Sequence, residues 1–109
     1  MSTDVVVLLS NFPDADSARA AVRALVEERL AACGNIIPGV ESIYEWKGAI
    51  ETSAEVTVIL KTVASRADEA QARLRSLHPY EVPEILRLPV TGGWPDYLVW
   101  VAGNCRPPV

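Results

Sequence analysis

The 109-residue sequence lacks the features that mark several specialised classes of protein. Its two cysteines, Cys33 and Cys105, form neither a CxxC pair nor a disulfide-rich pattern. The apolar run Val5–Leu9 near the N-terminus is too short for a secretory leader or a membrane span, and no basic segment precedes it. These absences predict a reduced, soluble, cytoplasmic protein with no membrane partner.

Positive charge is also scarce, with 10 Lys and Arg against 14 Asp and Glu, and the net charge is −4. A non-specific nucleic-acid binder needs a basic surface, so we expect no nucleic-acid partner. Thr91-Gly92-Gly93 matches no phosphate-binding loop. No nucleophile–His–acid arrangement follows from position, and a Cys33–His78 pair has no local support. We therefore expect no enzyme, and a small cation or small polar ligand fits the charge.

The first third of the chain predicts a strand and a helix. Val5–Leu9 is a short buried strand, and Ser10–Pro13 is expected to be a loop. Asp14 is the expected N-cap, and Gly34-Asn35 the expected helix end. One helical face is apolar, formed by Ala18, Val22, Leu25, Val26 and Leu30.

The segment Ile36–Thr62 predicts a long antiparallel β-hairpin with its turn at Lys47-Gly48. Pro38-Gly39 cannot lie in an unbroken central strand, so the first arm is expected to bend or bulge there. The first arm, Ile36–Lys47, has twelve residues and would extend roughly 40 Å. A domain of about 109 residues has a radius of gyration near ~13 Å. A long edge that carries aromatic side chains invites aggregation unless it is covered. Pairing between copies of the chain covers it; folding back at Pro38-Gly39 is the alternative.

The remaining chain predicts a second helix, a strand and a short terminal helix. Ser65 with Asp68 resembles a capping box, and Pro79 ends the helix at His78. Glu84–Val90 is the expected strand and Asp96–Ala102 the expected terminal helix; the tail Arg106–Val109 is expected to fray. The order predicts one α+β domain over residues 1–109, a ferredoxin-like βαββαβ sandwich with a long hairpin and a short C-terminal helix.

Two segments are distinctive: LAACGNIIPGVESIYEWKGAIE at Leu30–Glu51 and HPYEVPEILRLPVTGG at His78–Gly93. Both resemble signatures of the CutA family of divalent-cation tolerance proteins, and the likeness continues through Val58–Thr62 and Tyr97–Trp100. The resemblance implies a ferredoxin-like homotrimer whose hairpins pair between subunits, arranged as in PII signalling proteins. It also implies a role in tolerance to divalent metals, copper in particular.

Three residues are candidate metal ligands: His78, Glu84 and Cys33. Neutral imidazole suits copper or zinc, and a thiolate suits Cu(I) or zinc. Their ordinary alternatives are a helix-capping histidine, a Glu84–Lys61 ion pair and a small buried cysteine. Family members proposed to bind copper carry a cysteine after the first strand and a second histidine beside the first. Ser10 and Leu77 occupy those positions here, so no cofactor is obligatory and weak binding of copper or another divalent cation is expected.

A second set of residues predicts a cleft between subunits. Lys61 lies among apolar neighbours and needs a partner, either a carboxylate or an anionic ligand. The candidate lining residues are Lys61, Tyr44, Tyr80, Tyr97 and Trp100. Interface packing is the alternative role for the aromatic residues. This set supports a second hypothesis, a PII-like signalling or scaffold trimer that binds a small anionic ligand.

Overall fold

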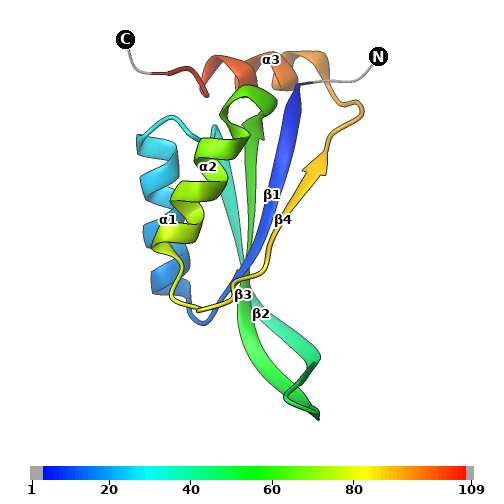
Figure 1. Cartoon of the computed structure of the whole chain (residues 1–109). Coiled ribbons are helices and arrows are strands. Elements are labelled where there is room, and N and C mark those ends of the chain that lie inside the picture. Colours follow the sequence, from blue (N-terminus) through cyan, green and yellow to red (C-terminus); the bar gives the residue numbers. More distant parts are fainter. Residues whose placement is uncertain (1–3, 108–109) are drawn as a thin grey trace.

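The computed structural model describes residues 4–107, so Pro108 and Val109 of the expected frayed tail lie outside the described residues. Helices α1 and α2 lie on one face of a four-stranded antiparallel sheet with the strand order β2-β3-β1-β4, and α3 crosses one end of it (Figure 1). The elements follow the predicted order: β1 Val5–Phe12, α1 Ala15–Glu27, β2 Cys33–Trp46, β3 Ala49–Val63, α2 Ala64–Leu77, β4 Ile85–Pro89 and α3 Pro95–Gly103. The ferredoxin-like fold class is thereby confirmed.

The main core lies between the sheet and the helix pair α1 and α2. Alternate residues of β1 and β3 enter it, with Leu8, Phe12, Val58 and Leu60 fully buried. A second apolar cluster forms where α3 covers one end of the sheet, and it contains Val5, Ala32, Val63, Val101 and Cys105. Among the described residues, no helix is long and apolar enough to cross a membrane.

Two boundaries near the N-terminus differ from prediction. The expected loop Ser10–Pro13 is wrong, because β1 continues to Phe12 with the Ser10 and Phe12 side chains fully buried. The helix that Asp14 caps ends at Glu27, well before Gly34. Gly34 lies in β2, where a Cβ would stand 2.6 Å from Cγ1 of Val22. Glycine is therefore needed for close packing of a strand against α1, rather than to end the helix.

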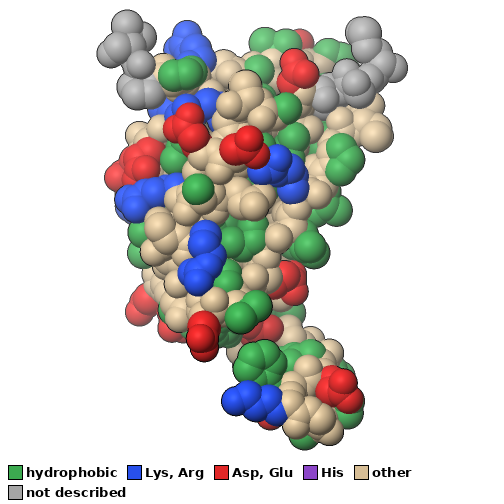
Figure 2. Space-filling model, viewed as in Figure 1, with side chains coloured by type: hydrophobic (Ala, Val, Ile, Leu, Met, Phe, Trp, Pro, Cys, Tyr) green, Lys and Arg blue, Asp and Glu red, His purple; other side chains and the backbone are tan. Residues whose placement is uncertain are grey.

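The long hairpin is present, and its tip projects beyond the rest of the molecule (Figure 1). The register shifts between Ile37 and Val40, so the predicted bulge at Pro38-Gly39 is confirmed. Lys47 and Gly48 form the predicted turn, both with positive φ. Figure 2 shows hydrophobic, basic and acidic side chains on the projecting lobe. The exposed fraction is 66% for Ile43 and 73% for Ile50.

The second half of the chain has one further correction. No side chain caps α2, so the predicted capping box is wrong. Asp68 instead accepts a 2.9 Å hydrogen bond from Arg87 on β4, a residue 19 positions away in the sequence. The end of α2 before Pro79 and the terminal helix α3 are confirmed, while β4 begins one residue after Glu84.

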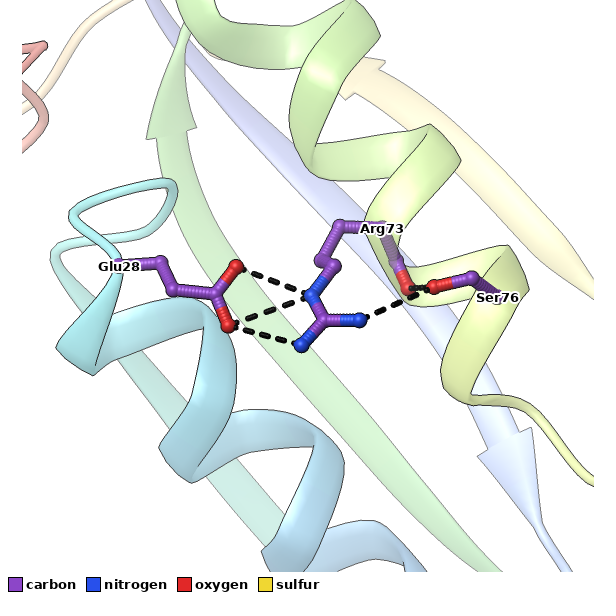
Figure 3. A network of polar contacts seen from close by, with 3 residues as sticks. All are labelled: Glu28, Arg73 and Ser76. Atoms are coloured by element: carbon purple, nitrogen blue, oxygen red, sulfur yellow. Dashed lines mark hydrogen bonds and ion pairs between the residues drawn. The ribbon is translucent and has the colours of Figure 1, made fainter.

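A polar contact joins the two long helices of the layer. Arg73 on α2 donates from Nε and Nη2 to the carboxylate of Glu28, the C-cap of α1, at 2.9–3.2 Å (Figure 3). The Ser76 hydroxyl donates to the Arg73 carbonyl, and Arg73 Nη1 lies 3.4 Å from the same hydroxyl. The Arg73 guanidinium lowers the pKa of Glu28. This fork of hydrogen bonds holds the end of α1 against α2.

Candidate functional site

A pocket of about 650 Å³ lies between the long hairpin, the end of β1 and the loop after α2. We call it the hairpin pocket. It is lined by Asn11, Ser42, Ile43, Tyr44, Trp46, Glu51, Ser53, Glu55, Tyr80, Glu81, Val82 and Glu84. Three of these residues are aromatic, four are glutamates, and none is lysine or arginine. The pocket therefore combines apolar walls with a concentration of negative charge.

Tyrosine hydroxyls fix polar groups of the wall. The Tyr80 hydroxyl donates to Oε2 of Glu55 at 2.9 Å, which joins the loop after α2 to β3. Partial burial, together with the neighbouring Glu55 carboxylate, raises the pKa of Tyr80 to about 12. The Tyr44 hydroxyl lies 3.3 Å from the Ser53 hydroxyl across the two hairpin arms. At neutral pH the Tyr80 phenol is therefore uncharged, and its hydroxyl holds the Glu55 side chain in place.

His78 lies directly behind Tyr80 and is only 6% exposed. Its Nε2 lies 2.7 Å from the Asn11 carbonyl, and its Nδ1 lies 3.1 Å from the Tyr80 amide N. The amide can only donate and the carbonyl can only accept, so the ring is neutral with its proton on Nε2. The ring stacks on Phe12 at 4.2 Å, and burial lowers the pKa of His78. His78 therefore positions the loop that carries Tyr80.

Asn11 connects His78 with Glu84. Its side chain donates from Nδ2 to Oε1 of Glu84 at 3.3 Å and accepts from the Thr57 hydroxyl at 2.7 Å. The buried Ser10 hydroxyl donates to the Glu84 carbonyl at 2.7 Å. Sequence reasoning missed Asn11, Thr57 and Glu55 as site residues. The sequence predicts a loop at Asn11, whereas its position in β1 brings it into contact with Thr57 on β3 and with Glu84 just before β4.

The structure brings His78 and Glu84 together through Asn11, but Cys33 lies elsewhere. Cys33 pairs in register with Lys61, which pairs with Val7, and Val7 lies four residues from Asn11 along β1. At about 3.3 Å per residue this is a separation of about 13 Å along the strand. Within residues 4–107, no three His, Cys, Asp or Glu side chains are grouped closely enough to hold a metal ion.

The predicted cleft residues also divide into two groups. Tyr44 and Tyr80 line the hairpin pocket, whereas Tyr97 and Trp100 lie on α3 at the opposite end of β2. The Tyr97 hydroxyl lies 3.5 Å from Sγ of Cys33, and its ring stacks on Trp100 at 5.7 Å. The pKa of Tyr97 is raised to about 12, mainly by the hydrogen bond with Cys33 and to a smaller extent by burial.

The partner of Lys61 differs from prediction. Lys61 Nζ donates to the Asn35 amide oxygen, and Glu84 accepts from Asn11 instead. The expected Glu84–Lys61 ion pair is wrong because the two residues occupy different heights of the sheet: Lys61 pairs with Val7, whereas Glu84 precedes the Ile85 that pairs with Ser10. The neutral side-chain amide of Asn35 is thus the hydrogen-bond acceptor of Lys61, for which the sequence indicated a carboxylate or an anionic ligand.

These features define a ferredoxin-like α+β protein with a projecting hairpin and an acidic, aromatic pocket beside it. The comparisons identify the family: the model of the CutA1 divalent ion tolerance protein family matches residues 6–104. The chain belongs to this family, which is described by divalent ion tolerance rather than by an enzymatic activity.

Individual relatives agree with the assignment. The chain is 44% identical over 98 residues to the divalent-cation tolerance protein CutA of Thermus thermophilus, covering 90% of this chain and 95% of the relative. It is 41% identical to CutA of Pectobacterium atrosepticum over 94% of both chains. The crystal structure of CutA from Xylella fastidiosa superposes with a TM-score of 0.93 at 42% identity, covering 95% of this chain and all of the other.

Proposed function

We propose that this protein is a cytoplasmic, single-domain subunit of a homotrimer that contributes to divalent-cation tolerance, copper included, by weak cation binding rather than by catalysis. The observation that carries the proposal is the placement of Glu55 and Glu84 in one pocket beside the His78–Asn11 network. Family membership supports the tolerance role.

The donor atoms of the pocket favour cations that accept oxygen ligands. Glu55, Glu84, Glu51 and Glu81 offer carboxylates, which suit hard divalent cations better than soft ones. Both ring nitrogens of His78 already make hydrogen bonds, so a metal at His78 has to displace one of them. Cys33 does not line this pocket, so its thiol would bind a metal ion apart from these carboxylates. Because the carboxylates are dispersed around a large pocket, the binding is expected to be weak.

The projecting hairpin supports the trimer. Ile43, Trp46 and Ile50 expose more than half of their surface near its tip, and Leu86 is 53% exposed on the edge strand β4. A long exposed strand with apolar side chains is an aggregation hazard unless another chain covers it. A closed ring in which each hairpin packs on the next subunit covers every copy in the same way.

Calorimetric titration with Cu(II) and with Zn(II) tests the metal role. We expect weak binding by the wild type and its loss in the double variant Glu55→Gln/Glu84→Gln. Glu45→Gln is the matched control, because Glu45 is on the same hairpin but does not line the pocket. Binding that is absent from the wild type, or unchanged in the double variant, would overturn the metal role.

Light scattering tests the assembly separately. We expect a mass three times the 11.8 kDa of one chain, and a smaller mass for Ile50→Lys. A wild type that stays monomeric at micromolar concentration would contradict the trimer. Complementation of a copper-sensitive deletion strain, with wild type against the double glutamate variant, then connects binding to tolerance.

A further inference from the structure

We draw no further inference here: the strongest candidate, the pocket of about 230 Å³ between the ends of α1 and α3 that Arg29 and Arg106 line as candidate anion ligands, carries nothing, because Glu27 and the carboxyl-terminal ends of both helices line the same pocket and account for the two arginines, and nothing else in the structure points to a ligand there.

Discussion

The Tyr80 hydroxyl donates a 2.9 Å hydrogen bond to Oε2 of Glu55 and so ties the loop after α2 to the base of the hairpin. The two residues are 25 positions apart in the sequence. The same loop is held from behind by His78, whose Nδ1 accepts from the Tyr80 amide. Tyr80 thus links the packed body of the domain to the arm that projects from it.

Replacing Tyr80 with phenylalanine is expected to lower the free energy of unfolding by about 1 kcal/mol at pH 7, measured by urea denaturation. A hydrogen bond to a charged group contributes roughly 1.5–3 kcal/mol, and partial exposure of the pair reduces that value. The pKa of Tyr80 is raised to about 12, so the neutral phenol is favoured in the folded state.

The pH dependence of this variant follows from the raised pKa. The contribution of Tyr80 is complete below the unfolded-state pKa of about 10 and disappears as the pH rises through about 12. The difference between wild type and Tyr80→Phe should therefore narrow in alkaline solution. A difference that is constant from pH 8 to pH 12 would contradict the assignment.

The single histidine should titrate below the ordinary histidine range. Burial lowers the pKa of His78, so its proton NMR signal should shift at a midpoint below about 6.5 in the folded protein and near 6.5 in urea. Its contribution to stability is complete above the unfolded-state pKa and is lost as the pH falls through the folded-state value. A folded-state midpoint at or above 6.5 would show that the ring is not held neutral.

His78→Gln should destabilise the protein by about 2 kcal/mol at pH 7.5, because the stack on Phe12 and the contacts to Asn11 and Tyr80 are lost. The difference in unfolding free energy between wild type and His78→Gln should shrink in mildly acidic solution, because protonation of His78 already destabilises the wild type there. Denaturant midpoints at pH 7.5 and pH 5 provide the comparison.

Gly34→Ala should cost about 1–3 kcal/mol by overpacking. A Cβ at Gly34 would lie 2.6 Å from Val22 Cγ1 and 2.8 Å from Leu60 Cδ2, both in the core between α1 and the sheet. Gly92→Ala is the matched control, since a Cβ there meets nothing within 4 Å. Equal thermal midpoints for the two variants would refute close packing at Gly34.

Glu28→Gln should lower the thermal midpoint modestly and make it less sensitive to salt. Arg73 lowers the pKa of Glu28, so the contribution of this pair is present above the ordinary glutamate pKa and is lost as the pH falls through the lowered value. Glu27→Gln is the control: its partner Arg23 lies 3.8 Å away, and both side chains are more than 60% exposed. A larger effect at Glu27 would contradict the role of the Glu28–Arg73 contact.

Local patterns were sufficient to predict most of the elements. The apolar spacing of α1, the cap at Asp14, the turn at Lys47-Gly48 and the bulge at Pro38-Gly39 all depend on neighbours in sequence. The errors arose where distant contacts decided the outcome. A glycine in the position of Gly34 is typical of a helix end, but its role is to leave room for the side chains of Val22 and Leu60. Asp68 has the spacing of a cap, but Arg87 engages it.

The candidate site also combines features that the sequence predicted with features that only distant contacts decide. The sequence by itself determined the fold class, the family resemblance and the long hairpin, and it named His78, Glu84, Tyr44 and Tyr80 as candidates, because these follow from periodicity and from distinctive motifs. Only the tertiary structure decided which of these residues meet. Antiparallel register sets the height of each side chain in the sheet, so Cys33 and Lys61 lie at one end, and Glu84 lies beside Asn11 toward the other. Register is a property of paired strands, and no single segment contains it.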